Sequence, residues 1–144
     1  MAAGYQHVAC CVEGPDDAGP ALPEAVRVAE LSGARLSLVH VAESPRRFSG
    51  GRTTRTPPED VLAAEIVGEA RAWLEPMASG IDGAEAVVLQ GSDPAEEILA
   101  WAREAGCELI VVHPRRRGVA RLVLGSVAAR LAREAPCPLM LVPA

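Results

Sequence analysis

The stretch Leu109-Ile-Val-Val-His-Pro-Arg-Arg-Arg-Gly-Val-Ala-Arg-Leu-Val-Leu-Gly-Ser-Val-Ala128 decides the fold. It begins with an apolar run typical of a buried strand, continues through a basic loop, and ends in a Gly-Ser step that is expected to open a helix. An α/β protein places phosphate groups at such a junction, because free backbone N–H groups and the helix dipole point at the loop. The stretch therefore predicts an α/β fold with a candidate anion site.

Five short apolar runs alternate with four helical patterns along the whole chain. We expect strands at 6–12, 35–41, 84–89, 108–112 and 138–142. Their apolar residues are continuous, which is typical of strands covered by helices on both faces. We expect helices at about 19–32 and 58–79, from Asp93 to Gly106, and from Gly125 to just before Pro136. This βαβαβαβαβ order implies a parallel sheet with right-handed crossovers.

Glycine and proline mark the expected helix ends. Gly33 is expected to end the first helix, and Pro76 to fray or kink the last turn of the second. At the start of the third helix, Asp93 suits the N-cap, Pro94 suits the first helical position, and Glu96 is placed to complete a capping box. The one long connection, residues 42–57, has the length of a lid or a mobile loop.

Size and composition favour one folded domain over residues 1–144. The chain has 144 residues, of which 49% are hydrophobic, so a globular domain with one core is expected. No apolar run approaches the length of a membrane span, and no charged-then-apolar leader opens the chain. We therefore expect a cytoplasmic protein that does not bind membranes.

The charge pattern excludes several classes of function. The formal net charge is -5 and the chain has only two Trp, one Tyr and one Phe, which disfavours nucleic-acid binding. All 14 basic residues are arginine, so Walker A, Schiff-base and receiver-domain lysines are all missing. Four arginines lie in 46–55 and four in 115–121. Two interpretations stay open for these loops: they bind a small anion, or they are solvated turns.

The cysteines and histidines do not form a recognisable catalytic or metal-binding motif. No CxxC pair occurs among the four cysteines, which are Cys10, Cys11, Cys107 and Cys137. A metal site or a disulfide framework is therefore not expected. Cys10 and Cys11 are expected to face opposite sides of a strand. His113 follows the fourth strand and lies in the expected ligand crevice, where it is either a phosphate contact or an ordinary loop residue.

Five segments, in the right order and spacing, resemble the universal stress protein family. The final run of the opening stretch, Arg121-Leu-Val-Leu-Gly-Ser-Val127, matches that family's segment before the last helix. The other four are Leu38-Val-His-Val41, Gly91-Ser-Asp-Pro-Ala-Glu-Glu-Ile-Leu99, Glu108-Leu-Ile-Val-Val112 and Ala135-Pro-Cys-Pro-Leu-Met-Leu-Val142. The resemblance covers nearly the whole chain and identifies it as a member of this family.

The resemblance implies a three-layer, Rossmann-like fold of the flavodoxin-like or adenine nucleotide alpha hydrolase-like type. Its five-stranded parallel sheet would have the order 3-2-1-4-5 with four helices, and a ligand would bind where that order reverses. In the nucleotide-binding branch of the family an Asp after the first strand lies near the base and ribose. Glu13 holds that position here, and the family's backbone contact to the base falls on Val41.

The phosphate loop departs from the family pattern G-x2-G-x9-G-[ST]. Val112 and Arg115 replace the first two glycines, whereas Gly118, Gly125 and Ser126 remain. Gly125 can turn the chain, and the N–H groups of Ser126 and Val127 are expected to hold an oxyanion. Either the arginines from Arg115 onward bind phosphate by charge-assisted hydrogen bonds, or the site has decayed.

Two functions follow. The first is a regulatory module of the stress response that weakly binds ATP, another adenine nucleotide or a related anion, with Mg²⁺ carried by the nucleotide. The second is an interaction protein of the same fold that binds no nucleotide and has no cofactor. An enzyme that acts on a small phosphorylated substrate is a weaker alternative, because the sequence shows no catalytic base and any nucleotide hydrolysis is expected to be slow. In both cases the resemblance implies a homodimer through the apolar edge strand Leu139–Val142.

Overall fold

The computed structural model describes residues 4–16, 19–43, 59–114 and 125–143. In chain order they form β1 (His7–Cys11), α1 (Ala21–Ser32), β2 (Arg35–Glu43), α2 (Glu59–Ser79), β3 (Ala84–Gly91), α3 (Pro94–Ala105), β4 (Leu109–Val112), α4 (Ser126–Glu134) and β5 (Leu139–Leu141). All nine elements lie where the sequence predicts them, with ends that differ by one or two residues. The predicted loop 42–57 lies outside the described residues from position 44 onward.

The strands form one parallel sheet in the order β3-β2-β1-β4-β5, as predicted. β2 and β3 are longer than expected, because their pairing continues as far as Glu43 opposite Gly91. β1 stays bonded to β2 through the Val12 N–H and the Val39 carbonyl oxygen, 2.9 Å apart. The pairing of β1 with β4 ends at Cys10 opposite Val111. The two central strands therefore part at their carboxyl ends.

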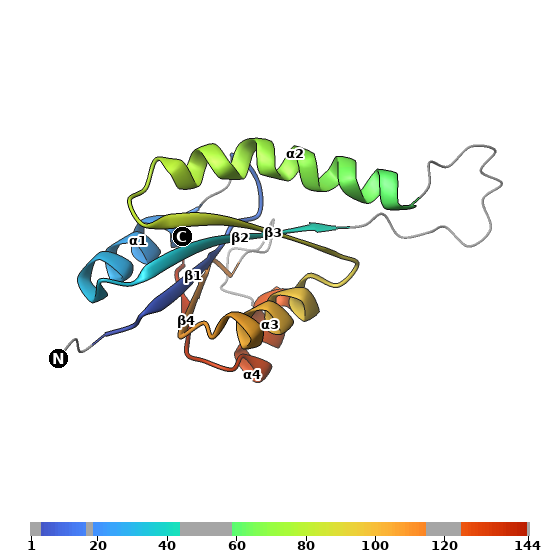
Figure 1. The fold of residues 1–144 in the computed structure, drawn as a ribbon. Helices are drawn as coiled ribbons and strands as arrows, with labels where there is room; N and C mark the ends of the chain where they lie inside the picture. Colours follow the sequence, from blue (N-terminus) through green and yellow to red (C-terminus); the bar gives the residue numbers. More distant parts are fainter. Residues whose placement is uncertain (1–3, 17–18, 44–58, 115–124, 144) are drawn as a thin grey trace.

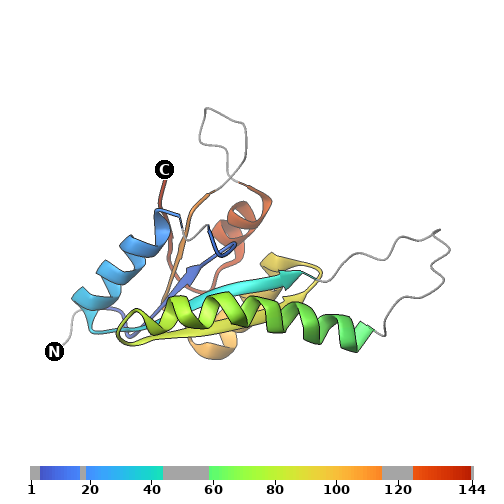
Figure 2. The ribbon, with the colours of Figure 1, turned by 90° about the horizontal axis from the view of Figure 1, so that it is seen from above.

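Helices cover both faces of the sheet. α1 and α2 lie on one face, and α3 and α4 lie on the other (Figure 1). Figure 2, seen from above, shows α2 running along β2 and β3. Successive strand residues alternate between the two layers, because their side chains point to opposite faces. Cys10 packs under α1 and α2, whereas Cys11 packs under α3 and α4, and all four cysteines are free thiols.

The observed helix ends can be compared with the glycine, proline and capping residues that predict them. Gly33 ends α1 with a φ of 70°, a conformation that glycine adopts without steric cost. Asp93 caps α3 by accepting from the Glu96 N–H at 3.4 Å. The Glu96 carboxylate, which the spacing predicts as a capping-box partner, bonds Arg130 of α4 through Oε2. α2 continues through Pro76 to Ser79, so its last turn does not fray at the proline, and a kink there stays a prediction.

Candidate functional site

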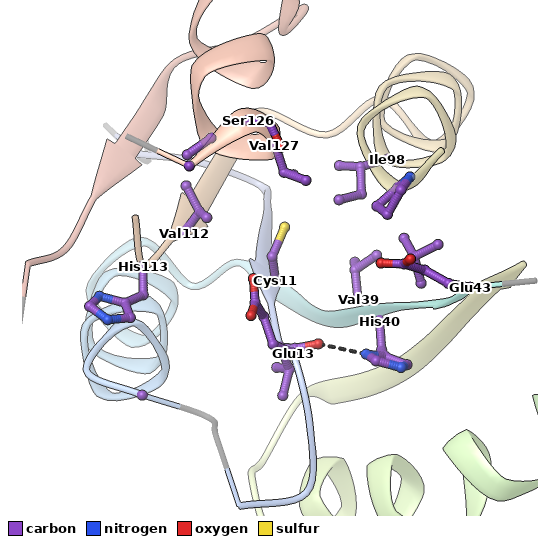
Figure 3. Close-up of a pocket in the computed structure, with 16 residues that line it drawn as sticks. Cys11, Glu13, Val39, His40, Glu43, Ile98, Val112, His113, Ser126 and Val127 are labelled. Carbon is purple, nitrogen blue, oxygen red and sulfur yellow. Dashed lines mark hydrogen bonds between the residues drawn. The ribbon is translucent and has the colours of Figure 1, made fainter. Parts of the chain in front are cut away.

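A cavity of about 300 Å³ lies at the carboxyl ends of the central strands, where the strand order reverses. Its walls come from β1, β2 and β4, from the residues that follow β1 and β4, and from the starts of α3 and α4 (Figure 3). Chain segments that end adjacent parallel strands meet at one edge of the sheet, and a reversal of order leaves a crevice between them. The fold therefore produces this cavity where the sequence predicts a ligand site.

Seven of the nine predicted site residues line the cavity. They come from four separate segments: Glu13, Val41, Val112 with His113, and Gly125 with Ser126 and Val127. The remaining two, Arg115 and Gly118, lie outside the described residues. The sequence thus placed side chains from distant segments around a common space, although their contact with a ligand stays a prediction.

The inner wall of the cavity is apolar. Cys11, Val39, Val112, Ile98 and Val127 surround the open space, and the Cys11 sulfur points between Ile98 and Val127 (Figure 3). Val112 and Ile98 are almost fully buried, with 6% and 5% of their surface exposed. Such a wall suits a flat ring or another apolar group, with polar groups at the rim fixing its orientation.

Three of these wall residues were not predicted as site residues. Cys11 lies two residues before Glu13, and Val39 lies two residues before Val41. Because strand side chains repeat their direction every second residue, each pair shares one face of the sheet. Ile98 comes from α3, one turn after Pro94. The strand period was the available signal for Cys11 and Val39, whereas Ile98 depends on how α3 packs.

Polar side chains form the rim of the cavity. Glu13 and Glu43 supply carboxylates, Ser126 a hydroxyl group, and His40 and His113 imidazole rings. The described lining residues include no arginine, so positive side-chain charge at the predicted phosphate end would have to come from the loop that begins at Arg115. The rim can therefore accept hydrogen bonds from a ligand at Glu13 and Glu43.

Both rim histidines are held by backbone carbonyl groups. His40 Nδ1 lies 2.8 Å from the Val12 carbonyl oxygen, and His113 Nδ1 lies 2.8 Å from that of Val142. A carbonyl oxygen can only accept, so each Nδ1 carries a proton and donates it to that carbonyl. The His40 ring also stands edge-on to Trp73, with centroids 4.7 Å apart. His113 therefore ties the cavity rim to the residue that follows β5.

Its surroundings make the Cys11 thiol a poor nucleophile in this structure. Burial raises its pKa well above the usual range, and the neighbouring Cys10, Cys107 and Glu13 raise it further. Burial likewise raises the pKa of Cys10 to about 12. The thiolate is the reactive form of cysteine, so both residues stay protonated at neutral pH. Cys11 contributes a soft, apolar surface to the cavity.

The first turn of α4 forms the opposite side of the cavity. Gly125 is its N-cap residue, with φ -63° and ψ 163°, an extended conformation open to any residue. The sequence predicts that Gly125 turns the chain, but these angles do not require glycine. Gly125 therefore contributes to the cavity by having no side chain. The Ala129 N–H bonds the Gly125 carbonyl oxygen at 2.9 Å, so the amides of Ser126, Val127 and Ala128 precede the helical ladder. These are the groups that a helix offers to an anion.

Two further properties of the described part of the chain bear on its chemistry. None of its helices combines the length and apolarity that crossing a membrane requires. No group of three or more His, Cys, Asp or Glu side chains within these residues is arranged to hold a metal ion.

Comparison with known proteins agrees with this architecture. A universal stress protein of Thermus aquaticus is 34% identical over 140 residues, which covers 96% of this chain and 98% of the relative. Universal stress protein UspA from Lactobacillus plantarum superimposes with a TM-score of 0.71 at 20% identity, covering 97% of this chain and 99% of that one. The universal stress protein of Archaeoglobus fulgidus in complex with dAMP gives a TM-score of 0.61 at 25% identity, with 98% of both chains covered.

The family model for the Universal stress protein family matches residues 4–143, nearly the entire sequence. Together with the strand order, the four helices and the Thermus relative, this match shows that the chain belongs to the universal stress protein family.

Proposed function

We propose that this protein is a regulatory module of the stress response that binds an adenine nucleotide at the cavity between β1 and β4. One observation carries the proposal: seven predicted contact residues from four distant segments line a single cavity at the switch point of the sheet. The Archaeoglobus fulgidus relative, whose structure was determined with dAMP, supports the choice of an adenine nucleotide.

The lining suggests how the nucleotide would lie. The adenine ring suits the apolar wall of Val39, Ile98 and Cys11, within reach of the Val41 backbone. Glu13 would accept hydrogen bonds from the ribose hydroxyl groups. The phosphates would face the first amides of α4, where Ser126 and Val127 offer N–H groups and the helix dipole favours negative charge. Arg115 and Gly118 belong to this proposed phosphate end, and Mg²⁺ would be carried by the phosphates.

The proposed protein acts by binding rather than by turnover. Its nucleotide-bound and free forms would differ in what they present to partners, and any hydrolysis would be slow. We further propose that the chain is a single domain, that it acts in the cytoplasm, and that it forms a homodimer through Leu139–Val142. The half-buried apolar side chains of β5, at the edge of the sheet, support the dimer.

Calorimetric titration tests this function. Any nucleotide that copurifies is first identified after denaturing a sample, and the emptied protein is then titrated with ATP and Mg²⁺, AMP and adenosine. Saturable binding of at least one of them is the expected result. An absence of copurified nucleotide together with no heat from any of the three would overturn the proposal.

A second function, an interaction protein that binds no nucleotide, is favoured by Val112. Its buried side chain occupies the cavity wall at a position where the family pattern has glycine, and a glycine there would let an anion approach the backbone. The same titration separates the two functions. Without nucleotide binding, the surfaces of the proposed dimer become the place to look for a partner.

A further inference from the structure

Two of the cavity walls belong to helices that the chain does not connect directly. α3 precedes β4 and supplies Pro94 and Ile98, whereas α4 follows β4 and supplies Ser126, Val127 and Ala128. Both helices pack on the same face of the sheet. The width of the cavity therefore depends on what holds the first turn of α3 against α4.

Arg130 of α4 bridges this gap with all three guanidinium nitrogens. Nη1 donates to Asp93 Oδ2 at 2.7 Å, and Nη2 donates to Glu96 Oε2. Nε donates to Glu134 Oε2 at 2.7 Å, one turn further along α4. The first two partners begin α3, and the third keeps the guanidinium plane in place. A planar, rigid fork of donors suits several carboxylates at once better than an ammonium group would.

Asp93 gives the bridge a fixed anchor on α3. Its Oδ1 accepts from the Glu96 N–H as the helix cap, while its Oδ2 accepts from Arg130. The cap contact and Arg130 together lower the pKa of the Asp93 carboxyl, so it is ionised at neutral pH. One residue thus fixes where α3 begins and where α4 lies relative to it.

Arg130 and its carboxylate partners are only partly buried, which suits a role in positioning the two helices. The Arg130 side chain is 28% exposed, while Asp93 and Glu96 are each 56% exposed. Ion pairs this open to water add little to the stability of a fold, and their effect is mainly geometric. Ala95 of α3 and Ala128 of α4 are both nearly fully buried. The bridge therefore acts at the rim of a helix pair whose interior is already packed.

We propose that Arg130 is a positioning residue that holds α3 against α4 and so sets the width of the ligand cavity. The inference rests on the proposed function only in taking this cavity as the ligand site. Without Arg130, three carboxylates lose their shared cation and repel one another, and the first turn of α3 moves away from α4 more often. The cavity then opens on the side of Ile98 and Val127, toward which the Cys11 sulfur points.

Alkylation of Cys11 measures this opening without any ligand. The Cys11 sulfur faces Ile98 and Val127, whereas the adjacent Cys10 is 0% exposed and lies on the other face of the sheet. The full chain is treated with N-ethylmaleimide, and tandem mass spectrometry assigns each adduct to one of the four free thiols, so that the rate at Cys11 is followed separately. In Arg130→Gln we expect Cys11 to react about three- to tenfold faster than in the wild type, the range that two part-exposed ion pairs provide. Cys10 should stay unreactive.

Arg133→Gln is the matched control. Arg133 lies on the same helix, is exposed, and carries the same charge. Its removal should leave the Cys11 rate unchanged. An unchanged Cys11 rate in Arg130→Gln, an equal rise in Arg133→Gln, or a parallel rise at Cys10 would each overturn the proposal. If Arg130→Gln does not fold, Arg130→Lys is measured; it keeps the charge but loses the fork of donors, so a smaller rise in the Cys11 rate is expected, and no rise would overturn the proposal.

Binding of adenosine provides the second readout. Adenosine is uncharged, so a change of protein charge alone should alter its affinity little. We expect its Kd to rise in Arg130→Gln and to stay unchanged in Arg133→Gln; equal Kd values in both variants and the wild type would contradict the inference. If the wild type binds no adenine compound, the proposed function fails, while the Cys11 rates still decide whether Arg130 sets the cavity.

Discussion

His7 of β1 and Ser37 of β2 are joined inside the sheet by a hydrogen bond of 2.7 Å between Nε2 and Oγ. Both are buried, with 3% and 0% of their surface exposed. The Ser37 hydroxyl donates to Glu85 Oε1 at 2.8 Å, so its oxygen accepts the proton of His7 Nε2. His7 Nδ1 faces Arg35 Nη2 at 3.4 Å and is therefore the unprotonated nitrogen. The arrangement holds a neutral imidazole.

This pair predicts a loss of stability in mild acid. Burial lowers the pKa of His7 and Arg35 lowers it further, whereas the Ala105 carbonyl, Glu85 and Glu108 act in the opposite direction. The unfolded chain therefore binds a proton at His7 more readily than the folded chain. Above the unfolded pKa of about 6.5, His7 makes its full contribution to the free energy of unfolding. This contribution is lost as the pH falls below that value, and the total loss is about 1.4 kcal/mol for each unit by which the folded and unfolded pKa values differ.

Urea unfolding between about pH 5 and pH 8 measures this loss. In His7→Gln, which cannot titrate, the free energy of unfolding should depend less on pH than in the wild type. His40→Gln is the control, because it also removes an imidazole but one at the cavity rim. A pH dependence that His7→Gln leaves intact would show that His7 is not responsible.

Gly125→Val should abolish nucleotide binding while the fold persists. The backbone of Gly125 is extended, so a valine is tolerated conformationally, but its side chain would stand at the start of α4 inside the proposed phosphate end. We expect the Kd for AMP to rise by at least about tenfold, equivalent to 1.4 kcal/mol. Calorimetry measures the affinity, and circular dichroism checks the fold.

Gly68→Val is the control for this variant. Gly68 lies on the exposed side of α2, and a Cβ built there meets nothing within 4 Å. Its affinity for AMP should equal that of the wild type. Normal binding by Gly125→Val would place the phosphates elsewhere.

Val112→Gly should raise the affinity for ATP relative to adenosine. Removing the side chain frees space beside the first turn of α4 and lets a phosphate approach the β4 backbone. One added hydrogen bond to a charged group is worth about 1.5 kcal/mol or more. The ratio of the affinity for ATP to the affinity for adenosine should therefore rise by about tenfold. The variant should also lose about 2 kcal/mol or more of stability, because a buried side chain is removed.

Titrations of Val112→Gly and Val112→Ala with ATP and with adenosine test this effect. Alanine removes bulk without giving the backbone the freedom of glycine. The ratio of ATP affinity to adenosine affinity in Val112→Ala should therefore lie between the ratios of the wild type and Val112→Gly. A ratio that stays constant across the three proteins would mean that Val112 does not limit phosphate access.

The fold follows from local signals because those signals agree with one another. Continuous apolar runs such as Leu109–Val112 mark strands covered on both faces, and Gly33 and Gly106 stop helices through positive φ angles of 70° and 67°. The strand ends then place Glu13, Val41 and Val112 around one space, which is why most of the predicted site residues share a cavity.

What the sequence could not supply is the tertiary partner of a polar side chain. Glu96 has the spacing of a capping-box residue, yet it bonds Arg130, 34 positions away. Ile98 enters the cavity only because α3 packs against β2 and α4. His7 carried no motif, and its role depends on the register that places β2 beside it. Local spacing predicts elements, whereas these contacts depend on how the elements pack.

Leu141→Pro should abolish the proposed homodimer without disturbing β4. The Pro138 carbonyl accepts from the Ile110 N–H at 3.1 Å, and the Val142 N–H bonds the Val112 carbonyl at 3.0 Å. Because backbone groups alternate sides along a strand, Leu139 and Leu141 direct theirs away from β4. A proline at 141 therefore removes a donor only from the outer edge, where a second chain would pair.

Light scattering at micromolar concentration checks this prediction. We expect a dimer for the wild type and for Leu141→Val, which keeps the N–H group, and a folded monomer for Leu141→Pro. Met140→Pro would be uninformative by comparison, because Met140 directs its N–H toward β4 and its loss would disrupt the sheet itself. A monomeric wild type would remove β5 as the dimer interface, whereas a dimeric Leu141→Pro would locate the interface on another surface.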